Sequence, residues 1–367
     1  MANKKKQIIK VIATILAVIL LFVGSFGGYL LYRFNCDKSS DYRFVSNDYS
    51  NIYEQQTPTY DVREDGKFTV LKINDTHFYN GTCEDDKHTL SYLKNVIATA
   101  SYDFVIVNGD LVEGFNLKSD YDKYKAIDLF ANMLEDYNVP WTFAPGNNDG
   151  EIDGDNDAII TFMMEYPHFV YGNSEGVYGD MQFFVDLIYN GELAHSLAIL
   201  DSGMRKPKAI GKYEYIQESQ INWLLDGINE RKVPTSVFFH MPVPSFESAF
   251  DNGEAYEGFT MYKTYPYTDI PKNVLFDDMT KHNEYISLIS CAHQHSNNMC
   301  SFYEGRWYQL SSVSGYSAGR DDFIIPSVTL TKIDVTADNA KDMYTFEQIT
   351  QIMKGETDER QFQIHAF

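Results

Sequence analysis

Five short apolar runs in this chain are each followed at once by residues whose side chains can bind a cation. The runs are Phe68–Asn74, Phe104–Asn108, Val139–Ala144, Ser236–Phe239 and Tyr285–Ser290. Bounded apolar runs of this length are typical of buried β-strands. Helical patterns over Thr89–Ala100, Tyr121–Asn138 and Glu218–Glu230 alternate with them, as in βαβ units. The sequence therefore predicts an α/β fold in which several strands end at cation-binding residues.

A second group of strand-like runs stands apart from these five. Its members are Phe183–Ile188, Ser196–Leu200, Trp307–Ser312 and Ser327–Val335. Two successive strand-rich halves are consistent with two packed sheets. With 367 residues, 44% of them hydrophobic, the chain is long enough to bury such a core.

The charge balance excludes one class of function. The chain carries 30 basic and 52 acidic residues, a formal net charge of −22. Such a charge repels a phosphate backbone at long range, so we do not expect the protein to coat nucleic acid. Phosphate chemistry stays possible, because bound divalent cations are often the largest local charges in a site.

The N-terminus has the pattern of a membrane anchor. Four lysines within the first ten residues precede an uncharged stretch, Val11–Tyr32, and Arg33 closes it. A stretch of this length can span a bilayer and exceeds the apolar region of a cleaved signal peptide. Small residues around Gly24–Gly28 leave cleavage as the alternative. Because lysines stay cytoplasmic, we expect a single-pass protein whose folded part lies outside the cytoplasm.

These observations divide the chain into four parts. Residues 1–35 are expected to form a cytoplasmic stub and transmembrane helix, and residues 36–65 a polar, Tyr-rich stalk. Residues 66–336 hold all five motifs and form the predicted catalytic domain. Residues 337–367 are expected to be a polar, partly helical tail.

The residues after the five runs form a plausible set of metal ligands. The predicted ligands are Asp75, His77, Asp110, Asn147, His240, His293 and His295. In open α/β sheets, ligands bind beyond the carboxyl ends of the strands. Asp75 and His77 are two residues apart on an extended strand end, so both side chains are expected to reach one ion. Asp110 follows Gly109, which permits close approach, and its two oxygens can bridge two ions.

This donor set predicts the metal and the reaction. Carboxylate and amide oxygens mixed with imidazoles suit Mn, Fe or Zn. Two such cations about 3.5–4 Å apart would acidify a bridging water and hold phosphoryl oxygens during in-line attack. The nucleophile would be this metal-bridging hydroxide, so no Ser or Cys nucleophile is required. The sequence therefore predicts a hydrolase of phosphate esters with a dinuclear centre.

The motifs together resemble the calcineurin-like metallophosphoesterase superfamily, in the branch related to purple acid phosphatases. The resemblance covers roughly Lys67 to Val335. The supporting stretches are Val139-Pro140-Trp141, Leu200-Asp201-Ser202-Gly203 and Tyr215-Ile216-Gln217. The resemblance implies a four-layer αββα sandwich of two mixed β-sheets flanked by helices, and hydrolysis of phosphate mono- or diesters.

The resemblance also assigns the ligands to two ions. One ion takes Asp75, His77, Asp110 and His295, and the other takes Asp110, Asn147, His240 and His293. Small phosphate esters, nucleotides and phospholipid headgroups all remain possible substrates.

Three positions depart from the family pattern. Asn148 stands where the family has a His that approaches the substrate phosphate, and Asp149 is normally the partner that orients this His. Asn148 can donate a hydrogen bond but cannot transfer a proton, which would slow turnover of esters with poor leaving groups. Glu113 replaces the Tyr ligand of the purple enzymes, and Ala292 replaces a glycine.

Asn148 and Asp149 are therefore the candidate catalytic residues beside the ligands. The loss of the His also defines the alternative function: a catalytically impaired, surface-displayed binding protein that keeps its metal.

Two further features leave alternatives open. Cys291 and Cys300 bracket the His-x-His motif, and they either close a disulfide or remain buried thiols. The aromatic-rich segment Pro242–Tyr267 follows His240 and reads as a long loop. It either overhangs the site and selects substrates or packs on itself at the surface.

Overall fold

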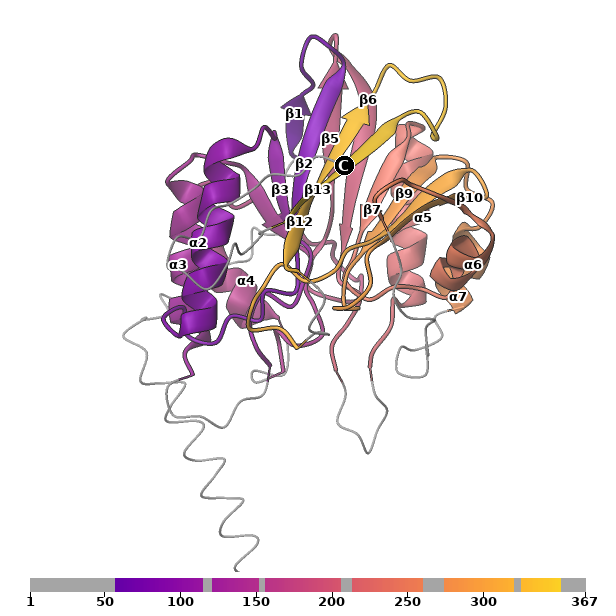
Figure 1. Ribbon diagram of the computed structural model, residues 1–367. Coiled ribbons are helices and arrows are strands. Elements are labelled where there is room, and N and C mark those ends of the chain that lie inside the picture. Colours follow the sequence, from indigo (N-terminus) through magenta and orange to yellow (C-terminus); the bar gives the residue numbers. More distant parts are fainter. Residues whose placement is uncertain are drawn as a thin grey trace, which may run out of the picture.

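Two mixed β-sheets lie face to face with helices on both outer sides in the computed structural model (Figure 1). The structure describes residues 57–114, 121–151, 156–205, 213–259, 274–319 and 325–350. Helices α2 and α3 flank one sheet, and α5, α6 and α7 flank the other (Figure 1). The α/β architecture of two mixed sheets predicted from the sequence is confirmed, in four layers.

The smaller sheet carries the first three motifs. Its strands in spatial order are β13 (Tyr344–Thr350), β12 (Ser327–Asp334), β2 (Lys67–Ile73), β3 (Phe104–Val107) and β4 (Trp141–Phe143). β2, β3 and β4 run parallel, whereas β12 is antiparallel to both β2 and β13. The carboxyl ends of β2, β3 and β4 therefore meet at one edge of this sheet.

The larger sheet carries the last two motifs. Its spatial order is β1 (Thr59–Asp61), β5 (Gln182–Tyr189), β6 (Glu192–Leu200), β7 (Thr235–Phe238), β9 (Ile286–Cys291), β11 (Arg306–Leu310), β10 (Met299–Tyr303) and β8 (Glu254–Ala255). β6, β7, β9 and β11 run parallel to one another. β5 pairs antiparallel with β6, and β10 pairs antiparallel with β11. At the two edges, β1 pairs parallel with β5 and β8 pairs antiparallel with β10. The ends of β7 and β9 face the same edge as those of β2 and β3.

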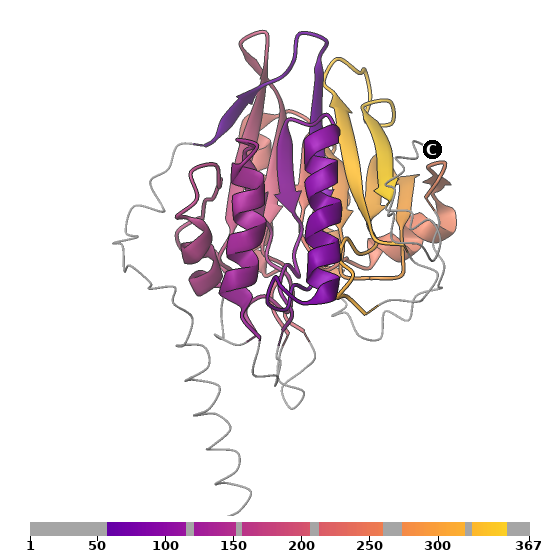
Figure 2. The same cartoon turned by 60° about the vertical axis from the view of Figure 1, so that its left-hand side comes forward.

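The helices cover the outer faces through apolar stripes. On the smaller sheet lie α2 (Glu84–Thr99), α3 (Lys123–Glu135) and α4 (Asp157–Met163), with α2 and α3 side by side (Figure 2). On the larger sheet lie α5 (Glu218–Arg231), α6 (Ser245–Asn252) and α7 (Val274–Thr280). The stripe on α5 is formed by Ile221, Leu224 and Ile228, all fully buried.

A polar seam crosses the interior between the two sheets. The ammonium of Lys72 on β2 donates to Ser290 Oγ and to the Cys291 carbonyl on β9, both at 2.8 Å. Lys72 is fully buried, and burial lowers its pKa to about 7. Nearby, Gln309 Nε2 donates to Thr331 Oγ1 at 3.3 Å. These contacts fix how the two sheets align, and thus how the two halves of the site meet.

Both ends of the predicted domain extend further than the sequence indicated. The expected stalk reached residue 65, but β1 within it pairs with β5. The expected tail began at residue 337, but β13 pairs along the whole of β12. Tyr344, Phe346 and Ile349 are buried, while the polar residues Thr345, Glu347 and Gln348 stand between them. This partial alternation is weak in sequence, which is why a polar, partly helical tail was expected, wrongly for this segment.

The segment Pro242–Tyr267 is not one long loop. Residues 245–252 form α6, whose Phe246 and Ala249 are buried against the larger sheet. Phe259 packs with Tyr256 and Phe346 instead of facing the site. For these aromatic residues the alternative of self-packing is therefore correct. Residues 260–273 lie outside the described part of the chain.

The two cysteines beside the His-x-His motif are free, buried thiols. Cys291 lies on β9 and Cys300 on β10, and β11 runs between these two strands. A disulfide needs Cα atoms closer than about 7 Å, and strands that are not neighbours stand roughly 9–10 Å apart. The disulfide alternative is therefore wrong, and the alternative of unpaired thiols holds for both.

The predicted transmembrane segment, Val11–Tyr32, lies outside the described residues. Among the helices that the structure does describe, none combines the length and the apolar character needed to cross a bilayer.

Candidate metal centre

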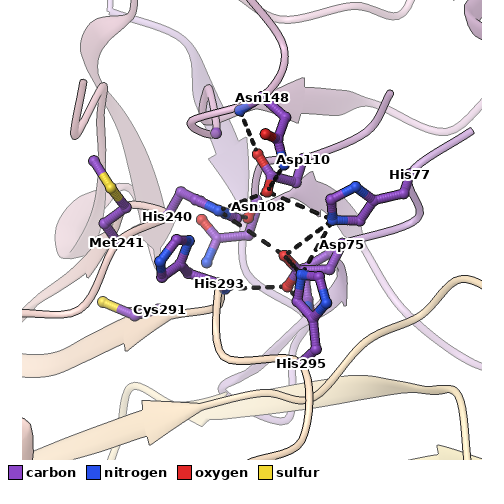
Figure 3. Close-up of polar contacts among 12 residues, drawn as sticks. Asp75, His77, Asn108, Asp110, Asn148, His240, Met241, Cys291, His293 and His295 are labelled. Atoms are coloured by element: carbon purple, nitrogen blue, oxygen red, sulfur yellow. Dashed lines mark hydrogen bonds and ion pairs between the residues drawn. The ribbon is translucent and has the colours of Figure 1, made fainter. Parts of the chain in front are cut away.

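Five loops from the two sheets converge at one edge of the sandwich. Asp75 and His77 follow β2, Asp110 follows β3, and Asn147 follows β4. His240 follows β7, and His293 and His295 follow β9. Figure 3 shows the carboxylates of Asp75 and Asp110 between the imidazoles of His77, His240, His293 and His295. The structure thus brings together residues up to 220 positions apart in the chain.

A first group of ligand atoms surrounds the carboxylate of Asp75. Its members are Asp75, His77, Asp110 and His295, whose ligand atoms all lie within 4.8 Å of one another. His295 Nε2 is 3.4 Å from Asp75 Oδ1, and His77 Nε2 is 3.5 Å from Asp110 Oδ2. The Nε2 atoms of His77 and His295 face each other at 3.1 Å. These distances leave the four donors around one common point.

A second group shares Asp110 with the first. Asp110, His240 and His293 also hold their ligand atoms within 4.8 Å of one another. His240 Nε2 is 3.4 Å from Asp110 Oδ2, the same oxygen that His77 approaches. Asp110 therefore stands between two sets of donors, as the sequence predicted for a bridging carboxylate.

Four buried atoms that could bind a metal have no hydrogen-bond partner among the described residues. They are Asp75 Oδ1, Asn147 Oδ1, His240 Nε2 and His293 Nδ1. Buried polar atoms in native proteins nearly always have a partner. Here the unpaired atoms are oxygens and imidazole nitrogens with free lone pairs, which suit Mn, Fe or Zn. The residues present therefore fit two cations, and Asn147 adds the amide oxygen that the sequence assigned to the second.

The ligands are presented by an unusual backbone. Asp75, His77, Asp110 and His293 have φ of +49°, +47°, +50° and +72°. Non-glycine residues rarely adopt this left-handed conformation, and such residues cluster at functional sites. Asp75 and His77 therefore reach the same point through two left-handed residues, not through the extended strand end that the sequence suggested.

Gly109 is required at its position by space as well as by conformation. Its φ is +83°, and an added Cβ would lie 2.6 Å from Cγ of His240 and 2.8 Å from Cα of Gly146. Any larger residue would push the loops after β3, β4 and β7 apart. The glycine thus lets Asp110 and His240 approach the same cation.

Outer hydrogen bonds orient the imidazoles. His240 Nδ1–H donates to the Asn108 carbonyl at 2.9 Å, and His295 Nδ1–H donates to the Gly319 carbonyl. Each bond leaves the Nε2 lone pair directed into the site. His77 instead turns its Nδ1 toward Glu113, whose Oε2 is 3.3 Å away. Glu113, at the position of the Tyr ligand in purple enzymes, thus lies on the far side of the imidazole from the other donors.

The carboxylates make the site strongly attractive for positive charge. Burial lowers the pKa of His77 and of His240, but the neighbouring carboxylates outweigh it and raise each pKa to about 9. Burial would raise the pKa of Asp110, yet His240 and His77 hold it well below its usual range. Burial and the adjacent His240 lower the pKa of His293 to about 3. Protons and cations therefore compete for His77 and His240.

Asn148 and Asp149 both act on the loop of Asp110. The backbone N–H of Asn148 donates to Asp110 Oδ1, and its side-chain amide donates to Asp110 Oδ2, each at 2.8 Å. Asp149 accepts from the backbone N–H groups of Asp110, Val112 and Gly146 at 2.8–3.1 Å. In the family, Asp149 would orient a His that this chain lacks. The structure shows instead that it ties the second and third motif loops together.

Asp86 is a second support that the sequence did not reveal. Its Oδ2 accepts from the backbone N–H groups of Tyr79, Asn80 and Gly81, just after His77. Its Oδ1 accepts from Ser317, whose loop packs on Thr76 through Gly315. An acidic residue in the first turn of a helix is ordinary, so its sequence offers no signal of this role.

Arg205 and Tyr213 were also missed. The Arg205 backbone N–H donates to the Asn147 carbonyl at 3.2 Å. The Tyr213 ring meets the His293 ring edge-on, with centroids 5.3 Å apart. Both follow the stretch Leu200-Asp201-Ser202-Gly203, which the sequence marked as similar to the family without a site role.

The fold and the site together define a class of protein. Two sets of His and carboxylate donors share one carboxylate at the carboxyl edge of a two-sheet sandwich. Two-metal sites of this kind occur in phosphatases, nucleases and aminopeptidases.

Comparison with known proteins identifies the family. Residues 68–297 match the model of the calcineurin-like phosphoesterases, so the chain belongs to this family. "Probable inactive purple acid phosphatase 14" of Arabidopsis thaliana is 26% identical over 301 residues, covering 69% of this chain and 71% of that protein. "Phosphatase DCR2" of Saccharomyces cerevisiae is 23% identical over 306 residues, covering 73% of this chain and 50% of that protein. The resemblance to the branch of purple acid phosphatases is confirmed.

A solved structure agrees with the fold. The crystal structure of a dimetal phosphatase from Danio rerio is similar with a TM-score of 0.50 at 12% identity. The match covers 72% of this chain and 92% of that one. Family membership and the ligand cluster together support a metal-dependent phosphoesterase with two metal ions.

Proposed function

We propose that this protein hydrolyses phosphate mono- or diesters at the site around Asp110. The observation that carries the proposal is the sharing of Asp110 by two sets of donors, several of whose atoms are buried without a partner. We assign Asp75, His77, Asp110 and His295 to one cation, and Asp110, Asn147, His240 and His293 to the other. The donor set favours Mn, Fe or Zn over Mg or Ca, which prefer oxygen alone.

Bound cations would supply an acidified water and positive charge for the phosphoryl oxygens. The protein's own residues provide the positioning. Asn108 and Gly319 hold the tautomers of His240 and His295, and Asp149 fixes the loop of Asp110. The side-chain amide of Asn148, 2.8 Å from Asp110, points at the same carboxylate. An amide cannot protonate a leaving group, so we expect esters with good leaving groups to react faster.

The same residue supports a second candidate function. A chain with Asn148 in place of the family His could keep its metals and bind phosphate esters without useful turnover. The Arabidopsis relative is itself named a probable inactive purple acid phosphatase. The second candidate is thus a metal-containing binding protein displayed at the surface.

A metal-dependence assay separates the two. The purified full chain in detergent, loaded with Mn, Fe or Zn and checked by elemental analysis, is offered p-nitrophenyl phosphate, bis-p-nitrophenyl phosphate, nucleotides and phospholipid headgroup analogues. We expect turnover that a chelator abolishes and that Asp110→Asn or His293→Ala lowers by more than about 100-fold. The matched controls are Asp226→Asn, on the exposed side of α5, and His168→Ala, which pairs with Glu135. Metal-loaded protein without turnover on any substrate would favour the binding protein.

We also propose that residues 1–35 anchor the protein in a membrane with the catalytic domain outside the cytoplasm. The support is the sequence alone: four lysines, then an uncharged stretch long enough to span a bilayer. Intact cells treated with an external protease should lose the domain while the N-terminus stays protected. Release of the protein from membranes by alkaline carbonate would contradict the anchor.

A further inference from the structure

Two short segments that follow β6, residues 201–205 and 213–216, run antiparallel beside the metal centre. We call them the two arms. Arg205 and Tyr213 pair across them as an isolated antiparallel bridge. At their base, the Glu214 N–H donates to the Met204 carbonyl at 2.8 Å, and the Met204 N–H donates to Glu214 Oε2 at 3.1 Å. The residues between the arms lie outside the described part of the chain. The arms themselves are therefore fixed to each other by several bonds.

The arms are also fixed to three of the loops that carry ligands. The Arg205 N–H donates to the Asn147 carbonyl at 3.2 Å, and Ser202 Oγ accepts from the N–H of Met241, next to His240, at 3.0 Å. The Tyr213 ring packs against His293 at an interplanar angle of 89°. The position of Arg205 is thus set by the same loops that position the second group of ligands.

The Arg205 side chain is partly exposed, as are two of the predicted ligands. Asp75, His77, Asp110 and His240 are buried, whereas His293 and His295 are partly exposed. The Arg205 side chain is 41% exposed, and its Nη1 is 3.7 Å from Oε1 of Glu151. The Glu151 N–H in turn donates to the Asn148 carbonyl at 3.2 Å. The guanidinium is therefore held beside the loop that carries Asn147 and Asn148.

The Arg205 guanidinium has N–H donors that make no hydrogen bond among the described residues. A separation of 3.7 Å is an ion pair and not a hydrogen bond. Within the residues that the structure describes, the Arg205 guanidinium makes no hydrogen bond. A guanidinium offers five N–H donors in a planar fork that matches two phosphate oxygens. Several carboxylates at this edge, among them Asp75, Asp110, Glu113 and Glu151, would repel a phosphate.

We propose that Arg205 is a substrate-binding residue whose guanidinium holds the nonbridging oxygens of the substrate phosphate, with the Tyr213 ring as the wall beside it. This inference rests on the proposed function for its choice of ligand. A permanent positive charge here favours a dianionic phosphate monoester over a monoanionic diester. The site is accordingly that of a phosphomonoesterase.

Binding of inorganic phosphate tests this without any turnover. The metal-loaded full chain in detergent is titrated with orthophosphate by calorimetry, with metal content measured on each sample. Arg205→Ala keeps the backbone bond to Asn147 and removes only the guanidinium. We expect its phosphate affinity to fall about 10–100-fold at unchanged metal content, and Arg205→Lys to lose less, because charge-assisted hydrogen bonds to phosphate are among the strong ones. Arg63→Ala is the matched control, since Arg63 is 39% exposed and also ion-paired but lies near Asp103, away from the site.

Each result decides the matter. Equal phosphate affinity in the wild type and Arg205→Ala overturns the inference, as does loss of metal from Arg205→Ala, which would give Arg205 a structural role. If the wild type turns over esters, Arg205→Ala should raise KM for monoesters at least about 10-fold and raise KM for diesters by less. A wild type without turnover whose phosphate binding depends on Arg205 would refute the phosphoesterase, but it would leave Arg205 as a phosphate-binding residue.

Discussion

Replacing Lys72 by Met should change how the stability of the protein depends on pH. Lys72 is fully buried between the sheets, and burial lowers its pKa from 10.5 to about 7. In the unfolded chain the ammonium is solvated and keeps its usual pKa. Between pH 7 and 10.5 the unfolded state therefore binds a proton that the native state does not, so stability rises with pH across this window.

The size of the effect follows from the two pKa values. One pKa unit corresponds to about 1.4 kcal/mol, so charging buried Lys72 costs about 5 kcal/mol of unfolding free energy below pH 7. Integrated from pH 7 to pH 9.5, the cost falls by about 3 kcal/mol. Lys72→Met has no such cost at any pH, although it leaves the Cys291 carbonyl without the donor that Lys72 supplies. Relative to the wild type, the variant should therefore lose about 3 kcal/mol of its stability over this range.

Urea unfolding followed by tryptophan fluorescence measures this difference, because all three tryptophans lie in the described domain. The metal is removed by chelator, so that the titration of His77 and His240 affects both proteins alike and cancels. The difference between the two midpoints should shift by about 1 M urea between pH 7 and pH 9.5. Lys332→Met, a 40% exposed lysine paired with Glu347 on the same sheet, should show no such trend. A midpoint difference that is flat over the range would refute a neutral Lys72.

Four further outcomes test the metal centre. Glu113→Gln should lower metal affinity about 10-fold or more, measured by chelator competition, because Glu113 orients His77; unchanged affinity would leave Glu113 without that role. The carboxylates raise the pKa of His77 and of His240 to about 9, so metal binding at pH 7.5 should release about two protons. The apparent metal affinity should therefore fall as the pH falls below 9. Calorimetry in buffers of different ionisation enthalpy counts the released protons, and no release would contradict the charged imidazoles. Gly109→Ala should lower the free energy of unfolding in urea by more than about 2 kcal/mol, because the added Cβ would clash with His240. A smaller loss would show that the loops can move apart. Asn148→His should raise kcat on alkyl phosphates more than on p-nitrophenyl phosphate, whereas equal gains would argue against a missing proton donor.

The elements that sequence predicted are those with a strong apolar period. Phe104–Asn108 and Tyr285–Ser290 correspond to β3 and β9 within a residue or two, because these strands are buried on both faces and read as continuous apolar runs. β13 was missed because polar residues separate its buried Tyr344, Phe346 and Ile349. β1, three residues long, has too little pattern to be seen, and only pairing with β5 defines it.

The ligands were accessible to sequence reasoning for a different reason. Their identities follow from donor chemistry placed after each strand, and this needs no knowledge of distances. What sequence did not contain is how the loops reach one point. The left-handed φ of Asp110 and the three backbone bonds that Asp149 accepts depend on residues far apart in the chain. Arg205 was missed for the same reason, since nothing near it in sequence points to Asn147.

The left-handed residues also explain why the supports around the centre matter. Each such non-glycine residue costs on the order of 1 kcal/mol or more, so the loops of Asp75, His77, Asp110 and His293 would relax if nothing held them. Asp149 holds the loop of Asp110, and Asp86 holds the chain just after His77. Neither carboxylate is among the predicted metal ligands, yet each accepts three backbone N–H bonds at this edge of the sandwich. These supports therefore hold the ligand atoms together in the folded protein, so that cation binding does not carry the entropic cost of ordering the loops.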